Sequence, residues 1–257
     1  MERIPTFDDL LREGTLPPVD GWDFSWLNGR ATEERPSWGY SRMLLSHITR
    51  ADAILDIQTG GGELFAEVLG EVASPPGTLA ATESWQPNLA IARNLLRQFN
   101  VSIVNVADDA DLPFADGSFD LVVSRHPTVV QWNEIARVLQ PAGIYLSQQI
   151  GAGSNRELTE FMMGRQPVSK RGGVEGARRE AEAAGLVVDD LRREALRLTF
   201  NDVAAVVYFL RKVIWTVPGF TAEGYRDELA LLHAHIEREG PFITHAQRLL
   251  VKAHKSV

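Results

Sequence analysis

The sequence predicts a doubly wound α/β fold, in which helices cover both faces of a mostly parallel sheet. From about residue 40 onward, short apolar segments alternate with helical patterns at a spacing typical of βαβ units. Glycine or proline turns separate them, as in 54-ILDIQTGGGE-63, where a buried strand runs directly into three glycines. We expect a seven-stranded sheet with a C-terminal antiparallel hairpin, because the last two strand-like segments flank a helical insertion.

Periodicity and punctuation justify each element up to residue 150. Helix 87–99 begins after a proline and repeats its apolar residues with a period near 3.6. Strand 78–82 follows the turn 74-SPPG-77, and strand 119–124 follows a polar loop that contains proline and glycine. The other elements expected here are helix 39–50, strand 53–57, helix 63–70, strand 101–106, helix 131–139 and strand 143–150.

The rhythm changes after residue 150. Helix 174–184 stops at Gly185, and Asn201 is expected to cap helix 202–214. The remaining elements expected are helix 156–163, a broken strand at 186–189 and 196–200, helix 222–238, and a final strand at 242–254. The predicted organisation is an N-terminal arm or lid at 1–40, a core at 41–200, a helical insertion or cap at 201–240, and a last core strand at 241–257.

Composition excludes several classes of function. The 257 residues include no cysteine, so disulfides, thiolate zinc sites and a cysteine nucleophile are absent. A net charge of −8 argues against a nucleic-acid partner, and the most basic stretch, 165–180, is interpreted as a solvated helix with its preceding loop. No segment is apolar enough to span a membrane, and the first residues lack the apolar region of a signal peptide. We expect a cytoplasmic protein, monomer or homodimer, with a small-molecule substrate.

The segment 58-QTGGGE-63 is either a cofactor loop or only a tight turn. Glu83 closes the next strand and lies 23 residues beyond Gly60, where an acid is placed to accept hydrogen bonds from ribose hydroxyls. Asp108 and Asp109 follow the third strand, where they can meet an adenine amino group. Acids at successive strand ends favour a nucleoside cofactor.

The type of cofactor follows from what the loop lacks. A dinucleotide fingerprint requires a third glycine where this chain has Phe65, and no lysine follows the glycines as in a phosphate-binding loop. A loop without lysine, ahead of Glu63, suits a cofactor without phosphates. S-adenosylmethionine fits this description.

These residues carry a family resemblance. The runs LDIQTGGGE, ATESWQPNLAIAR, LPFADGSFDLVVSRH and EIARVLQPAGIYLSQQIG resemble class I S-adenosylmethionine-dependent methyltransferases, in particular the small bacterial type with an LPF-x-D-x-SFD motif. The motifs cover about residues 53–150. The resemblance implies a Rossmann-like core, S-adenosylmethionine as cofactor and S-adenosylhomocysteine as product.

The resemblance also implies roles for individual residues. Gln58 replaces the family's usual first loop glycine, so its side chain must point away from the cofactor or hydrogen-bond to it. The implied cofactor contacts are Asp56, Gln58, Thr59, Gly60 and Gly62 with the methionine part, Glu83 with the ribose hydroxyls, Ser84 and Trp85 with the adenine or ribose face, Asp108 and Asp109 with the adenine edge, and Arg125 near the sulfonium.

Catalytic and substrate residues are expected beyond the fourth strand and in whatever covers the site. His126 is the candidate general base, although a histidine that satisfies a loop carbonyl is an equal alternative. The aromatic leader offers a lid with Trp26, Arg30, Trp38 and Tyr40 as substrate contacts; the alternative is an arm packed on the sheet edge. His233, His235 and His245 do not have the spacing of a metal site.

The predicted function is methyl transfer from S-adenosylmethionine to a small-molecule acceptor, whose reacting atom these residues do not specify. Three alternatives stay open. They are an RNA or protein methyltransferase, a non-catalytic S-adenosylmethionine-binding protein with a degenerate glycine loop, and a nicotinamide-dependent oxidoreductase.

Overall fold

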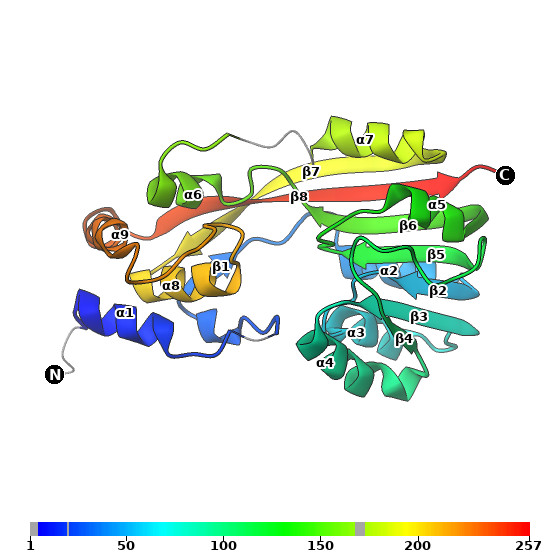
Figure 1. Cartoon of the computed structure of the whole chain (residues 1–257), viewed down its shortest axis with the longest axis horizontal. Coiled ribbons are helices and arrows are strands. Elements are labelled where there is room, and N and C mark those ends of the chain that lie inside the picture. Colours follow the sequence, from blue (N-terminus) through cyan, green and yellow to red (C-terminus); the bar gives the residue numbers. More distant parts are fainter. Residues whose placement is uncertain (1–4, 20, 168–172) are drawn as a thin grey trace. The chain divides into compact units, whose positions relative to one another are not determined.

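A computed structural model describes residues 5–19, 21–167 and 173–257 (Figure 1). Within these ranges one eight-stranded sheet has the order β1-β7-β8-β6-β5-β2-β3-β4. The strands are β1 (Ala31–Glu33), β2 (Ala53–Asp56), β3 (Thr78–Glu83), β4 (Ser102–Asn105), β5 (Phe119–Arg125), β6 (Leu139–Ile150), β7 (Leu186–Phe200) and β8 (Phe242–Lys255). The α-helices are α1 (Phe7–Thr15), α2 (Tyr40–Ile48), α3 (Glu63–Glu71), α4 (Gln86–Leu96), α5 (Trp132–Val138), α6 (Arg156–Met163), α7 (Val174–Ala183), α8 (Val203–Lys212) and α9 (Arg226–Glu239).

The chain divides into two compact units. The smaller contains the described residues of Met1–Arg35, Gly153–Ser169 and Ala195–Gln247, and the larger contains those of Pro36–Ala152, Lys170–Glu194 and Arg248–Val257. The described part of the N-terminal arm up to Arg35 lies in the same unit as the helical insertion, whereas residues 36–40 of the arm lie in the larger unit. Part of the basic stretch, residues 168–172, lies outside the described residues.

The larger unit has the topology of a doubly wound sheet. β2 pairs in parallel with β3 on one side and with β5 on the other, and the parallel pairs β3–β4 and β5–β6 extend the sheet outward. The chain thus moves away from β2 in one direction and then returns to its other side. The strand order reverses between β2 and β5, and ligands of such sheets bind beyond the carboxyl ends of the strands at this point.

Side chains of the parallel strands alternate between two buried layers. Ile54 packs with residues of α2, α3 and α4, whereas Leu55 packs on the opposite face with residues of α5 and α7. All four residues of β2 are buried, as expected for a strand with helices on both faces. The predicted mixed fold with a mostly parallel sheet is confirmed at this level.

The smaller unit has its own apolar core around α8. Residues 203–210 of this helix are all buried, and α1 packs against it. The α1 helix begins at a capping box, in which Thr6 and Asp9 each bond the other's backbone. β1 pairs antiparallel with β7, where Ala31 lies opposite Phe200.

Several details differ from the sequence predictions. The described sheet has eight strands instead of seven, because the short strand β1 pairs beyond β7. β7 runs unbroken from Leu186 to Phe200 instead of breaking in its middle. Asp202 caps α8 by accepting a hydrogen bond from the backbone N–H of Ala205, while Asn201 bonds the Gly29 carbonyl instead.

Candidate cofactor site

The glycine loop connects β2 to α3 with backbone conformations that suit glycine. Gly60 and Gly62 have φ angles of 68° and 80°. A Cβ on Gly62 would lie 2.8 Å from Cδ1 of Leu96, so the buried Leu96 side chain of α4 would have to shift to admit it. The Thr59 N–H donates to the Thr82 carbonyl at 2.9 Å, which fixes the loop to the end of β3.

Asp56 is a buried carboxyl group at the end of β2. Its side chain accepts a hydrogen bond from Thr59 Oγ1 at 2.6 Å, and only 7% of the residue is exposed. The pKa of Asp56 is raised from 3.8 to about 7, mainly by burial; the Thr59 hydrogen bond lowers it, and the nearby Glu83 charge raises it. Asp56 can therefore take or release a proton near neutral pH.

Glu83 lies at the end of β3, beside Asp56. Its Oε2 accepts from the Gly60 N–H and its Oε1 from the Trp85 N–H, both at 2.8 Å. Burial raises the pKa of Glu83 above its usual range, whereas backbone hydrogen bonds from Trp85, Gly60 and Ser84 lower it. A carboxylate has about four lone-pair positions, so at least one remains for a further donor beside the three backbone groups.

The residues after Glu83 supply an aromatic face and one polar atom that the sequence did not indicate. Trp85 is 42% exposed, and Ser84 lies between it and Glu83. Asn88, in the first turn of α4, is buried, and its Oδ1 has no hydrogen-bond partner among the described residues. The sequence gives no signal for Asn88, because the burial of its Oδ1 and the lack of a partner for it are visible only in the structure.

Gln58 occupies the position where the resemblance leads one to expect a glycine, and it adopts the conformation of one. Its φ angle is 56°, in the left-handed region. The side chain reaches the segment after β5, where it contacts the backbone of Thr128 and Val129. The hydroxyl of Thr128 in turn contacts the Asp108 carboxylate, while Asp109 is exposed.

His126 follows β5 with a φ angle of 55°. The indole of Trp38 donates to Gln148 Oε1 at 2.9 Å, so the amide nitrogen of Gln148 must be the donor to His126 Nε2, 3.0 Å away. His126 is thereby held as the tautomer that carries its proton on Nδ1. Burial, with the charges of Arg248 and Arg125, holds the pKa of His126 well below its usual range.

The four residues predicted as a substrate lid have other contacts. Trp38 and Tyr40 are buried in the larger unit, where the Tyr40 hydroxyl lies 2.9 Å from the Ser124 carbonyl and 3.2 Å from that of Leu146. In the smaller unit the guanidinium of Arg30 lies over the Trp26 ring and pairs with the carboxylates of Glu13 and Asp202. These contacts account for the four side chains without a substrate. Arg125 ends β5 and is exposed.

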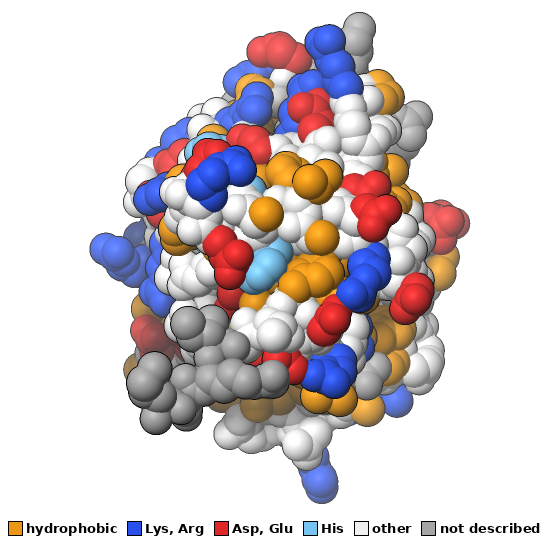
Figure 2. All heavy atoms as spheres, turned by 90° about the vertical axis from the view of Figure 1, so that its left-hand side faces the viewer, with side chains coloured by type: hydrophobic (Ala, Val, Ile, Leu, Met, Phe, Trp, Pro, Cys, Tyr) orange, Lys and Arg blue, Asp and Glu red, His pale blue; other side chains and the backbone are white. Residues whose placement is uncertain are grey.

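The histidines of the smaller unit lie among aromatic rings and carboxylates. His233 stacks on Phe7, and His235 packs against Phe161 and Phe242. Figure 2 shows a histidine among apolar side chains on one face of the molecule, with charged side chains around them. Within the described part of the chain, no group of three or more potential ligands could hold a metal ion. None of the helices in these ranges is long and apolar enough to cross a membrane.

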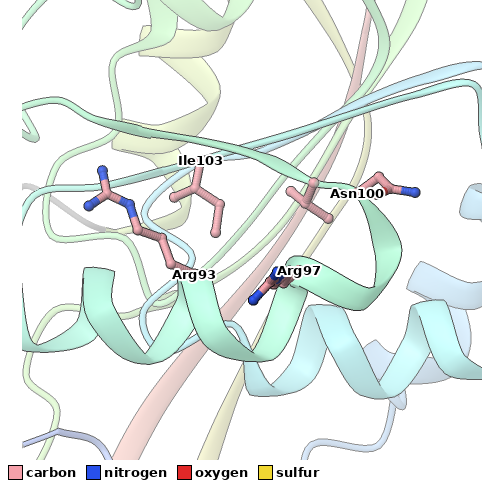
Figure 3. A pocket seen from close by; sticks show the side chains of 5 residues that line it. Arg93, Arg97, Asn100 and Ile103 are labelled. Atoms are coloured by element: carbon pink, nitrogen blue, oxygen red, sulfur yellow. The ribbon is translucent and has the colours of Figure 1, made fainter.

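A shallow depression of about 410 Å³ lies elsewhere on the larger unit (Figure 3). It is lined by Arg93 of α4, Ile103 of β4, and Arg97, Asn100 and Val101 of the connection between them. The amino end of β4 is at the opposite edge of the parallel sheet from the glycine loop. None of the residues predicted for the cofactor lines this depression.

Comparisons with known proteins agree with this architecture. Residues 55–147, a little over a third of the chain, match the family described as "Methyltransferase domain". No curated protein matches the chain. The matched segment contains the glycine loop, the acidic strand ends and the segment after β5.

Many solved structures share the fold at low sequence identity. The YcgJ protein of Bacillus subtilis has a TM-score of 0.60 at 17% identity, with 85% of this chain and 98% of that chain covered. Phosphoethanolamine N-methyltransferase 2 of Haemonchus contortus, in complex with phosphomonomethylethanolamine and S-adenosylhomocysteine, has a TM-score of 0.53 at 17% identity, with 99% and 61% covered. The cyclase SpnF has a TM-score of 0.51 at 20% identity, with 87% and 85% covered. These likenesses establish a Rossmann-like methyltransferase fold.

Proposed function

We propose that the larger unit binds S-adenosylmethionine at the carboxyl ends of β2 to β5 and that the protein transfers its methyl group to a small-molecule acceptor. The observation that carries the proposal is the geometry of Glu83. This buried carboxylate bonds the glycine loop through one oxygen and the start of α4 through the other, and at least one lone pair remains for a further donor. A ribose hydroxyl would supply this donor.

The other residues fit the rest of the same cofactor. Trp85 offers an exposed aromatic face for the adenine or ribose, and Asp108 a carboxylate for the adenine edge. Asp56 would lie toward the methionine part, together with Thr59 and the loop backbone. No Lys or Arg stands in the segment 57–63, which agrees with a cofactor without phosphates.

The cofactor brings an activated methyl group, so the protein has to align an acceptor, exclude water and, for some acceptors, remove a proton. His126 lies at the correct strand end for this last task. With the proton on Nδ1 and the lone pair of Nε2 directed at Gln148, it can act as a base only if Nε2 leaves this hydrogen bond. In its present state His126 is a donor through Nδ1, and we propose that it orients the acceptor.

Calorimetric titration with S-adenosylmethionine and S-adenosylhomocysteine tests the proposal. We expect micromolar binding of both, a loss of at least tenfold in Glu83→Gln and a greater loss in Glu83→Ala. Glu71→Ala changes an exposed glutamate at the end of α3 and should bind as the wild type does. Wild-type protein that is folded by circular dichroism but binds neither compound would refute the proposed function.

The class of acceptor rests on the charge and needs its own experiment. A net charge of −8 disfavours long nucleic-acid substrates, because phosphates are bound mainly by basic side chains. Retention of RNA in a gel at low salt, together with methyl incorporation into it, would instead favour an RNA methyltransferase. Cofactor binding without turnover on any acceptor class would favour a non-catalytic binding protein. A shift in melting temperature with NAD or NADP would favour the oxidoreductase.

A further inference from the structure

We propose that Gln58 is a positioning residue, whose side-chain amide holds the segment after β5 against the glycine loop and thereby sets the geometry of the cofactor site. The predicted effect on cofactor affinity rests on the proposed function. The attachment of the glycine loop to the segment after β5 does not depend on any ligand.

The amide of Gln58 makes a two-point contact with a stretch of backbone. Its Oε1 accepts from the Thr128 N–H at 2.6 Å, and its Nε2 donates to the Val129 carbonyl at 2.8 Å. The Thr128 hydroxyl is a third neighbour of Oε1, at 3.1 Å. The amide group therefore uses both its acceptor and its donor on the backbone of two adjacent residues.

The backbone of Gln58 is strained in the same place. A glutamine is disfavoured at a φ of 56°, where glycine has no Cβ to clash. Its own N–H donates to Thr82 Oγ1 at 3.0 Å, so this conformation is fixed from both the backbone and the side chain. Strain of this kind persists where the surrounding contacts over-determine the residue, and it concentrates at functional sites.

The contact spans the point where the strand order reverses. Gln58 follows β2 and Thr128 follows β5, and these strands are neighbours on either side of the switch. The Thr128 hydroxyl also contacts the Asp108 carboxylate, which follows β4. The hydroxyl has one proton, so it can donate to Asp108 or to Gln58 but not fully to both. Three loops that border the proposed cofactor site are thus joined through one glutamine and one threonine.

A glycine at position 58 would satisfy the backbone and leave the segment after β5 without this attachment. His126 belongs to that segment, two residues before Thr128. The glutamine is therefore interpreted as a functional replacement for the loop glycine and not as the mark of a degenerate site. Gln58 orders the segment after β5 at the cost of strain in its own backbone.

Three variants test the attachment. Gln58→Met keeps the length of the side chain and removes its hydrogen bonds, while Gln58→Gly also relieves the backbone. Gln58→Glu keeps an acceptor but sets a carboxylate oxygen against the Val129 carbonyl, and it regains a donor only when protonated. Ala142→Gly is the matched control for relief of strain, because Ala142 has a φ of 62°, is exposed near the start of β6 and carries no polar group.

The first readout is amide hydrogen exchange of the ligand-free protein. We expect exchange at Thr128 to accelerate at least tenfold in Gln58→Met and Gln58→Gly and to be unchanged in Ala142→Gly. In Gln58→Glu the acceleration should be present at pH 8 and shrink as the pH falls through the pKa of the new carboxyl group. A purely steric role for residue 58 would produce no such pH dependence. Unchanged exchange in Gln58→Met would overturn the proposal.

The second readout is titration with S-adenosylhomocysteine. We expect affinity to fall at least tenfold in Gln58→Met and Gln58→Gly, because only the fraction of molecules with an ordered segment is competent to bind. Faster exchange with unchanged or higher affinity would overturn the positioning role. If wild-type protein binds no S-adenosylhomocysteine while the variants exchange faster, the proposed function fails and the attachment of the loops stands.

Discussion

The stability of the larger unit should depend on the ionisation of Asp56. This carboxyl group is almost fully buried, and its pKa is raised from 3.8 to about 7, mainly by burial. At a pH between these two values the unfolded chain has released the proton and the folded protein still holds it. The folded state then binds one more proton, so the free energy of unfolding falls as the pH rises.

The magnitude follows from the two pKa values. Each pH unit within this interval lowers the free energy of unfolding by about 1.4 kcal/mol, and the whole contribution, about 4 kcal/mol, is lost once the pH exceeds 7. Asp56→Asn removes the titration and keeps a hydrogen-bonding group of the same shape. The variant should therefore gain stability relative to wild type as the pH rises from 4 to 8, and the two curves should run in parallel above this range.

Urea unfolding followed by circular dichroism, at one-unit steps between pH 4 and pH 9, measures the difference between the two proteins. Carbon-13 NMR of the Asp56 carboxyl group gives its pKa directly. A pH-independent difference between wild type and Asp56→Asn, or a carboxyl resonance that titrates near 4, would refute the reasoning. The conclusion would then be that water reaches Asp56 and removes the desolvation on which its raised pKa depends.

Three further predictions concern the same unit. Gly62→Ala should lower the free energy of unfolding by about 3 kcal/mol, since it combines a left-handed φ with a close contact. Gly185→Ala, with a φ of 84° and open space around it, should lower it by about 1 kcal/mol, and urea titrations compare the two. Nitrogen-15 NMR should show His126 neutral at pH 6 with its proton on Nδ1, and Gln148→Leu should remove this tautomer preference; a protonated ring at pH 6 would contradict the geometry. Arg137→Met should cost about 2 kcal/mol in chemical denaturation, because this guanidinium bonds two carboxylates and two loop carbonyls; a loss below about 0.5 kcal/mol would show that these bonds add no net stability.

The sequence predicted those parts of the fold that depend on local pattern. Apolar runs between glycine and proline turns gave every strand of the parallel sheet, and helix 156–163 coincides with α6. The helix α1 was missed although its capping box, Thr6 with Asp9, was present in the sequence. β1 could not be found in this way, because its three residues become a strand only through pairing with β7, more than 160 positions away.

The candidate site shows the same limit. Its acids were identified because they end strands, which is a local property. The partners of Trp38 and Tyr40 lie 84 to 110 positions along the chain, so nothing near these residues distinguishes a buried aromatic from a lid. Gln58 raised a question in the sequence, but its partner Thr128 is 70 positions away and carries no signal of its own.

The fold by itself does not decide the activity, since the cyclase SpnF shares it. Evidence for the activity comes from side chains that lower the stability of the fold and are therefore explained by a function. Asp56 and Glu83 are both buried carboxyl groups with raised pKa values, and apolar residues at the ends of β2 and β3 would avoid this desolvation. A ligand that carries positive charge and hydroxyl groups would offset the cost when bound, because it stabilises the ionised carboxylates and uses their free lone pairs. On this argument Asp56→Asn should be more stable than wild type at pH 8 and a weaker binder of S-adenosylmethionine, whereas a pair retained only for folding would lose stability when either acid is replaced.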